Sequence, residues 1–206
     1  MCKFKSGIIL KDRVFVPDYD SHTDILEELG IEDTQANAER LFVRAELYPR
    51  NGDVFSNIDE WEFNVDQDIL PDWFVAEYEK ERMIEAVKAW AKNRIFIGVD
   101  DLVLRDGNNF YVKNCENISC SNSTVTARGN STVTACSNST VTAWDNSTVT
   151  AWDNSTVIKD VWSSFNTDRL VLSENSTFKD CITHTLYQSG DFKLVTVTDG
   201  KIKREV

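Results

Sequence analysis

Carboxylates are the residues of this sequence whose types and spacing could most readily do chemistry. Six of them lie close together around Trp61: Asp59, Glu60, Glu62, Asp66, Asp68 and Asp72. Such a group could bind a basic partner, ligate a metal ion or supply paired catalytic carboxylates. A solvated strand edge and its loop explain the same residues without any of these functions. The spacing fits no EF-hand loop, which needs glycine at its sixth position and glutamate at its twelfth.

The histidines and cysteines predict no catalytic set and no zinc site. His22 lies beside Ser21, Asp20 and Asp24, but adjacent residues rarely reach triad geometry, and a helix N-terminus explains Ser21 and Asp24. The five cysteines form no CxxC pair and only two histidines are present, so four zinc ligands at suitable spacing are missing. We therefore expect free thiols in a reducing compartment, no cofactor and no enzymatic activity. An active site assembled from scattered residues stays open as an alternative.

An eight-residue unit repeats almost unchanged in the middle of the chain. In register it reads NSTVTARG from Asn122, NSTVTACS from Asn130, NSTVTAWD from Asn138 and Asn146, and NSTVIKDV from Asn154. Imperfect copies are NCENISCS from Asn114 and NSTFKDCI from Asn175. A fixed period of near-identical units is the signature of stacked repeats, and Thr-Val-Thr favours strand. The sequence therefore predicts a short β-solenoid, or β-helix, built from this unit.

Alternation along each strand divides the unit into an inner and an outer face. Val faces a narrow core, with Ser and Ala beside it. The threonines face outward with a variable seventh position, because a position that accepts Arg and Asp is not buried in a thin core. This seventh position holds Cys120, Arg128, Cys136, Trp144, Trp152, Asp160 and Cys181. The predicted outer face comprises Thr124, Thr126, Thr132, Thr134, Thr140, Thr142, Trp144, Thr148, Thr150 and Trp152.

One strand and one turn use one unit, so we expect about two units in each coil. Stacked coils lie about 4.7 Å apart, and residues two units apart should form ladders. One ladder would contain Cys120, Cys136 and Trp152; the other would contain Arg128, Trp144 and Asp160. Arg128 above Trp144 predicts a cation–π contact. Asn at each unit start, with Asp, Ser or Gly before it, supplies the turn.

A solenoid exposes strand edges at its ends and therefore needs caps. Segments 170–172, 186–187 and 192–197 predict strands, and Asp199–Gly200 predicts a hairpin turn, which together suit a C-terminal β cap. Trp162 and Phe165 lie in an irregular insert that we expect to cover an end or an edge. We assign residues 105–206 to the solenoid and its cap.

Residues 1–104 contain no repeat and predict an α+β domain. Segments 4–10 and 14–16 predict a β-hairpin, and segments 41–48, 61–65 and 95–99 predict further strands. Ser21 predicts the cap of a short helix over 24–29 that Gly30 ends, and 35–40 predicts another helical turn. After Pro71, a longer helix presents one apolar stripe, formed by Met83, Ile84, Val87 and Trp90.

The charge and hydropathy of the chain restrict the classes of partner that it could bind. The net charge of −12 and the pI of about 4.6 disfavour nucleic acid and anionic membranes and favour a basic partner. Solubility alone explains the same acidity. No apolar run approaches the roughly 20 residues of a membrane span, and the apolar stretch in MCKFKSGIILKDR is too short for a signal peptide. We therefore expect a cytoplasmic protein without membrane contact.

The opening MCKFKSGIILKDRVFVPDYDSHTDILEELGIEDT, with FVRAELYP and VDQDILPDWF, resembles a domain of uncharacterised proteins from gut bacteria and their phages. In some of these proteins the domain precedes NST-type repeats, and the resemblance covers nearly the whole chain. It implies a mobile-element origin and, with the absence of enzymatic motifs, an inhibitor of host defence of the anti-CRISPR kind. It brings no activity or residue role with it.

Two functions follow as expectations. The first is an acidic interaction protein that binds a host protein, for example one that handles nucleic acid, through the carboxylates around Trp61. The second is a structural or surface-recognition solenoid that uses its Thr and Trp face to form a homodimer or to bind a ligand.

Overall fold

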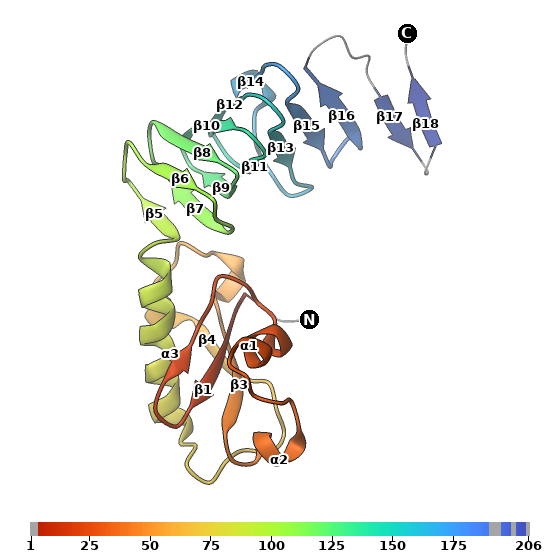
Figure 1. Cartoon of the computed structure of the whole chain (residues 1–206). Coiled ribbons are helices and arrows are strands. Elements are labelled where there is room, and N and C mark those ends of the chain that lie inside the picture. Colours follow the sequence, from red (N-terminus) through yellow and green to blue (C-terminus); the bar gives the residue numbers. More distant parts are fainter. Residues whose placement is uncertain (1–3, 190–194, 199–200, 205–206) are drawn as a thin grey trace. The chain divides into compact units, whose positions relative to one another are not determined.

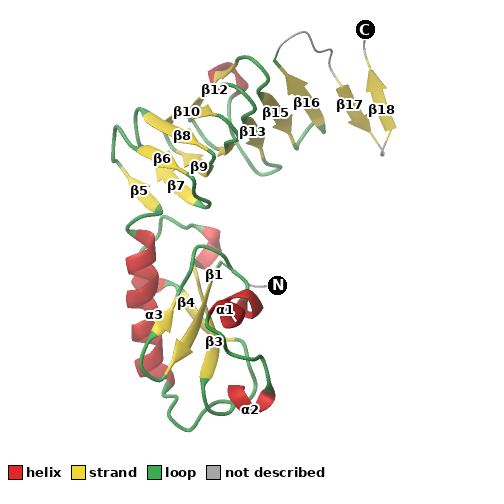
Figure 2. Cartoon of the chain, in the orientation of Figure 1, coloured by secondary structure: helices red, strands yellow, loops and turns green. Residues whose placement is uncertain are grey.

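The computed structural model describes residues 4–189, 195–198 and 201–204 (Figure 1). Contacts divide the chain into two units, Met1–Asn93 and Arg94–Val206. Figure 2 shows how they differ: helices and strands mix in the first unit, whereas strands and turns make up most of the second. The chain therefore contains an α+β part and a β-solenoid, as the sequence predicts.

An antiparallel sheet of four strands forms the centre of the first unit, in the order β2-β1-β3-β4. Its strands are β1 Lys5–Leu10, β2 Val14–Phe15, β3 Phe42–Tyr48 and β4 Glu62–Val65. The register sets Ser6 opposite Glu46 and Glu46 opposite Asn64. Directly opposed residues share a face of the sheet, so these three polar side chains lie on the same side.

Helices cover both faces of this sheet. They are α1 His22–Glu28, α2 Gln35–Ala38 and α3 Ala76–Ala91, with 3-10 turns η1 Arg50–Gly52 and η2 Ile58–Glu60. Ile8 packs in one buried cluster with Ile25 of α1 and Phe42. Gly7 points the opposite way, where an added Cβ would lie 2.9 Å from Met83 Cε of α3. The sheet therefore lies between α1 on one side and α3 on the other (Figure 1).

Parallel strands alternate between two sheets in the second unit. One sheet has the order β14-β12-β10-β8-β6, and the other runs from β5 through β7, β9, β11, β13 and β15. The first sheet contains β6 Val103–Arg105, β8 Ile118–Ser121, β10 Thr132–Cys136, β12 Thr148–Ala151 and β14 Leu170–Leu172. The second contains β5 Ile95–Ile97, β7 Phe110–Lys113, β9 Thr124–Arg128, β11 Thr140–Ala143, β13 Thr156–Lys159 and β15 Thr177–Asp180.

Neighbouring strands of the same sheet are offset by sixteen residues from β9 to β13, as between Ser123 and Ser139. Thr132 lies opposite Thr148 in one sheet, and Thr124 lies opposite Thr140 in the other. The outward threonines therefore form ladders on two opposite faces.

Ser, Val and Ala of the repeat face inward, as the alternation predicts. Val and Ala of β9 to β12 are fully buried, and the inward Ser residues are nearly so. The Ser hydroxyls close the turns: Ser131 Oγ donates to the Arg128 carbonyl at 2.7 Å, and Ser139 Oγ to the Cys136 carbonyl at 2.7 Å. A small hydroxyl at this position is therefore both buried and hydrogen-bonded.

In four of the repeat turns the left-handed residue precedes the Asn of the next unit. Gly129, Ser137, Asp145 and Asp153 have φ between 53° and 64°. The aspartates also link coils, because Asp145 Oδ2 accepts from Gly129 N and Asp153 Oδ2 accepts from Ser137 N, each at 3.1 Å. Asp, Ser and Gly therefore supply this turn conformation.

The coil that contains β8 departs from the predicted phase. Cys120 lies opposite Ala135 and is only 1 % exposed, so the predicted outward position of Cys120 and its ladder with Cys136 are wrong. The reason is Asn117, which takes a left-handed φ of 56° and acts as an additional turn residue before β8. Ile118, the fifth residue of its unit, therefore lies opposite Val133, the fourth residue of an NST unit, so the register is shifted by one residue.

The segment 95–99 contains a strand, but this strand belongs to the solenoid rather than to the α+β domain. Ile95 of β5 lies opposite Tyr111 of β7, in parallel register. Contacts accordingly divide the chain after Asn93 rather than at residue 104. Residues 94–104, assigned from the sequence to the α+β domain, belong to the solenoid.

The insert between β13 and β15 contains one buried and one exposed ring. Phe165 is 1 % exposed and packs edge-on against Phe178, whereas Trp162 is 84 % exposed. A 3-10 turn, η3 Thr167–Arg169, leads into β14. Phe165 therefore fills the core in the longest coil. Trp162 is exposed and does not cover the core.

Antiparallel strands follow the last parallel ones. They are β16 Thr185–Gln188, β17 Val195–Thr198 and β18 Lys201–Arg204. β16 pairs with β15, β17 with β16, and β18 with β17. The predicted Asp199–Gly200 turn and residues 192–194 lie outside the described residues.

Candidate functional site

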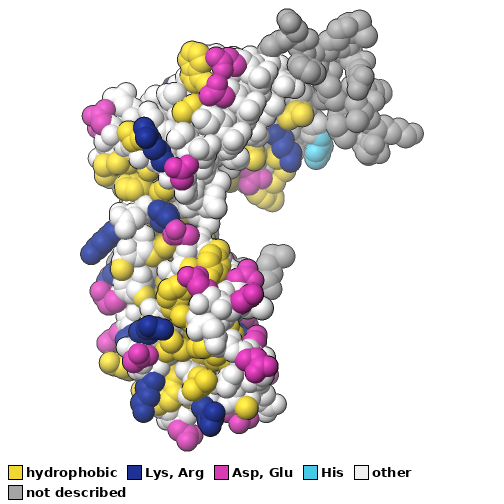
Figure 3. Space-filling view, viewed as in Figure 1, with side chains coloured by type: hydrophobic (Ala, Val, Ile, Leu, Met, Phe, Trp, Pro, Cys, Tyr) yellow, Lys and Arg dark blue, Asp and Glu magenta, His cyan; other side chains and the backbone are white. Residues whose placement is uncertain are grey.

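The negative charge of the chain is concentrated in the first unit. Met1–Asn93 contains 21 acidic and 11 basic residues, whereas Arg94–Val206 contains 13 and 11. Within the first unit, residues 51–79 include nine carboxylates and no Lys or Arg. On the face shown in Figure 3, much of the solenoid surface is uncharged, while acidic side chains recur over the first unit. A positively charged partner would therefore be attracted chiefly to the first unit.

All six carboxylates predicted as a binding group are exposed. Three of them have a cationic or ionisable neighbour: Asp59 pairs with Lys88 at 2.7 Å, Glu62 with Arg50 at 3.3 Å, and Asp66 with His22 at 3.3 Å. Hydrogen bonds from Lys88 to Asp59 and Glu85 raise the pKa of that ammonium group. No described residue forms an ion pair with Glu60, Asp68 or Asp72.

A surface pocket of about 580 Å³ adjoins part of this group. Asp59, Glu60 and Glu62 line it with Arg50 and Lys80, and Trp61 and Phe63 complete the wall. Trp61 itself is 2 % exposed, and its indole Nε1 donates to Ser56 Oγ at 3.0 Å. The pocket presents charges of both signs to solvent.

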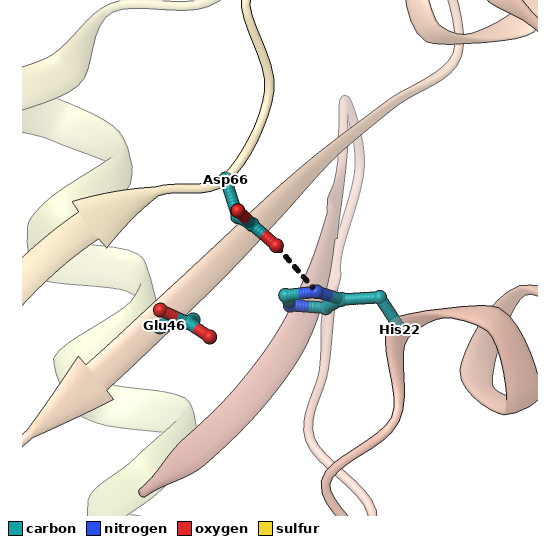
Figure 4. Close-up of side chains that lie close together, drawn as sticks. All are labelled: His22, Glu46 and Asp66. Carbon is teal, nitrogen blue, oxygen red and sulfur yellow. Dashed lines mark ion pairs between the residues drawn. The ribbon is translucent and has the colours of Figure 1, made fainter. Parts of the chain in front are cut away.

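A second arrangement joins residues far apart in the sequence: His22, Glu46 and Asp66 (Figure 4). One ligand-type atom from each lies within 4.8 Å of the others. His22 begins α1, Glu46 lies in β3, and Asp66 follows β4. Ser21 caps α1 by accepting from Asp24 N, so the start of the helix, and His22 with it, is held beside the sheet.

Two of the three side chains are buried. His22 is 7 % exposed and Glu46 is 4 % exposed, whereas Asp66 reaches solvent. Asn64 Nδ2 donates to Glu46 Oε2 at 3.3 Å from the neighbouring strand. Burying a carboxylate is costly without compensation, so Glu46 is an unusual residue for the interior of a small sheet.

The predicted neighbours of His22 take other roles. Ser21 is the helix cap, and Asp20 Oδ1 pairs with Lys5 Nζ at 2.5 Å. The sequence singled out His22 and Asp66 separately, but it did not connect them and it missed Glu46. The one available signal was a pair of charged residues two positions apart, Arg44 and Glu46, on a strand that is otherwise apolar.

The predicted outer face of the solenoid is divided between its two sheets. Its threonines are half-buried except Thr134, which is exposed. Trp152 is 43 % exposed at the end of β12. The predicted cation–π contact is confirmed, because the Arg128 guanidinium lies 4.6 Å from the Trp144 ring centroid. Arg128 therefore partly covers Trp144, and Trp152 is the more accessible of the two.

The described cysteines are all free thiols. Cys115 and Cys120 are buried, whereas Cys136 and Cys181 are half-buried. Burial raises the pKa of the Cys120 thiol to about 11. A thiol held in its protonated form is a poor nucleophile, so Cys120 is a core residue rather than a reactive one.

The chain was compared with protein-family models, curated proteins and solved structures. No family model, no curated protein and no solved structure matches the chain. Among the described residues, no helix is long and apolar enough to cross a membrane.

Proposed function

We propose that this chain is a non-enzymatic interaction protein whose acidic first unit binds a basic surface of a partner protein. The observation that carries the proposal is the run of nine carboxylates without a single Lys or Arg across residues 51–79. Glu60, Asp68 and Asp72 are exposed, and no described residue forms an ion pair with them, so they are available to a partner.

The class of partner follows from the charge. A surface that normally binds the phosphates of DNA or RNA is rich in Lys and Arg and attracts carboxylates in the same way. The resemblance of the opening segment to domains of gut-bacterial and phage proteins supports a role as an inhibitor of a host defence protein of the CRISPR type, in the cytoplasm of a bacterial host. The chain itself would avoid nucleic acid and anionic membranes.

The test is an affinity capture from a gut-bacterial lysate with the wild-type chain and the double variant Asp68→Lys, Asp72→Lys. We expect the wild type to retain a nucleic-acid-handling protein that the variant loses and that added duplex DNA displaces. The matched control is Asp168→Lys, an exposed acid of the solenoid, which should leave capture unchanged. Equal capture by wild type and double variant would contradict the proposal.

A second function rests on the solenoid. Trp152 and Trp162 are exposed large aromatic side chains on its surface, and exposed aromatic groups suit self-association or ligand stacking. If this surface forms a homodimer, Trp152→Ala should turn a dimer into a monomer by light scattering. Trp144→Ala should have less effect because Arg128 already lies against that ring.

We also propose that the eight-residue unit is the building block of the rigid scaffold, with two units in each coil and the antiparallel C-terminal strands as its cap. The sixteen-residue offset between Ser123 and Ser139 supports this interpretation. So does the change from parallel to antiparallel pairing at β16, since a hairpin ends a stack of coils without offering another parallel edge.

A further inference from the structure

The imidazole of His22 is placed between two acceptors. Its Nε2 lies 3.1 Å from the carbonyl oxygen of Ala45, and its Nδ1 lies 3.3 Å from Asp66 Oδ2. A carbonyl oxygen can only accept, so Nε2 carries a proton and donates it. In the neutral ring Nδ1 then carries the lone pair, 3.3 Å from a carboxylate oxygen, so the two atoms could hold one cation between them.

The same orientation is the one that metal-binding histidines adopt. Such a histidine donates its other ring N–H to a backbone carbonyl or a carboxylate, which fixes the ring and the tautomer. The Ala45 carbonyl serves as that acceptor for His22. The separation of Nδ1 and Oδ2, 3.3 Å, also suits two ligands of one tetrahedral ion, which lie roughly 3.3–3.4 Å apart for bonds near 2.05 Å.

The carboxylate of Glu46 offers a third ligand-type atom, within 4.8 Å of those of His22 and Asp66 (Figure 4). Asn64 Nδ2 donates a hydrogen bond to Oε2 of Glu46. Hydrogen bonds of this kind orient metal-binding carboxylates. A divalent ion would offset the burial of this charge, since Glu46 is only 4 % exposed.

A separate observation points to the same place. The Oγ of Ser6 is buried and has no hydrogen-bond partner within the described part of the chain. Ser6 lies directly opposite Glu46 in the β1–β3 register, on the same face of the sheet. Buried hydroxyls are normally satisfied, and a ligand or a metal-bound water beside Glu46 would satisfy this one.

We propose that His22 Nδ1, Glu46 and Asp66 bind one divalent metal ion, with Zn²⁺ as the best fit to one imidazole and two carboxylates. Three protein ligands leave a fourth position for water, and the exposure of Asp66 opens that position to solvent. The ion joins the start of α1 to β3 and the end of β4.

The experiment measures Zn²⁺ binding to the full chain by competition with a chromogenic chelator, in the presence of a phosphine reductant. The wild type should bind one ion, and Asp66→Asn should weaken binding by about 100-fold or more, since loss of a supporting group alone costs 10–100-fold. Asp68→Asn is the matched control: an exposed acid two residues away that lies outside the cluster and should change the affinity less than about twofold.

A spectroscopic arm separates this site from the thiols. Co²⁺ in place of Zn²⁺ should show visible d–d bands without a thiolate charge-transfer band in the near ultraviolet, and Asp66→Asn should abolish those bands. Glu46→Gln should do the same; because Glu46 is buried, its folding is checked by circular dichroism, whereas Asp66 is exposed and its variant should fold in any case. The proposal is overturned if the wild type does not bind, if Asp66→Asn binds equally well, or if the thiolate band appears.

Discussion

Cys120 and Cys136 test the register of the solenoid, because they should face opposite sides of its wall. Cys120 is 1 % exposed and lies opposite Ala135, whereas Cys136 is half-buried at the outward end of β10. The unit pattern alone would place both thiols in the same outward position. Their reactivities therefore distinguish the two registers.

The size of the difference follows from the thiolate population. The pKa of Cys120 rises from 9.0 to about 11 through burial, so at pH 8 its thiolate fraction falls about 100-fold relative to an ordinary thiol. Restricted access lowers its rate of alkylation further. We expect Cys136 to react with iodoacetamide at least about 100 times faster than Cys120 in the folded protein.

Tryptic mapping reads this out in one experiment. Cleavage after Lys113, Arg128 and Lys159 places Cys115 and Cys120 in one peptide and Cys136 in the next. After brief native alkylation, the first peptide should be unmodified and the second modified; in urea all three cysteines should react. Comparable native labelling of Cys120 and Cys136 would refute a register in which Cys120 faces the core.

Stability measurements complete this test. Cys120→Ser places a hydroxyl in the core and should cost about 1–3 kcal/mol of unfolding free energy, whereas Cys136→Ser should stay within about 0.5 kcal/mol. The raised pKa also makes the stability depend on pH. As the pH rises, the unfolded chain releases the Cys120 proton near pH 9.0, before the folded chain does near pH 11. Wild type should therefore lose stability between about pH 9 and 11 by up to about 2.7 kcal/mol, and Cys120→Ala should remove that loss.

Two further predictions concern other elements. Gly7→Ala should destabilise the first unit by about 1–3 kcal/mol in urea unfolding, because the new Cβ would lie 2.9 Å from Met83 Cε and 3.1 Å from the Phe15 carbonyl oxygen; wild-type stability would show that α3 does not lie against this face. Glu174→Gln should raise Tm at pH 7, since a hydrogen bond to Asp153 and the charge of Asp153 raise the pKa of Glu174, so that the folded state holds this proton better than the unfolded one. Its benefit should shrink as the pH falls below 4.5, the ordinary pKa of a glutamate, where Glu174 becomes protonated in both states; a Tm difference that does not depend on pH would contradict the shared proton.

Local patterns of the sequence predicted local structure well. The hairpin of β1 and β2, the Ser21-capped helix α1 and the long helix α3 all follow from alternation, capping residues and an apolar stripe. The inward Ser, Val and Ala of the repeat follow from the two-residue period of a strand. Each of these features depends on neighbours a few residues away, which is why the sequence reveals it.

The tertiary structure alone decided what distant residues do together. The phase of the coil that contains β8 depends on the conformation of Asn117, and the boundary between the units depends on which strand β5 pairs with. The partners of Asp59 and Glu62, Lys88 and Arg50, come from other elements. His22, Glu46 and Asp66 meet only because antiparallel pairing of β1, β3 and β4 brings the start of α1 beside Glu46 and the end of β4. The periodicity of a sequence indicates on which face of its own helix or strand a residue lies. It does not indicate which other element packs against that face.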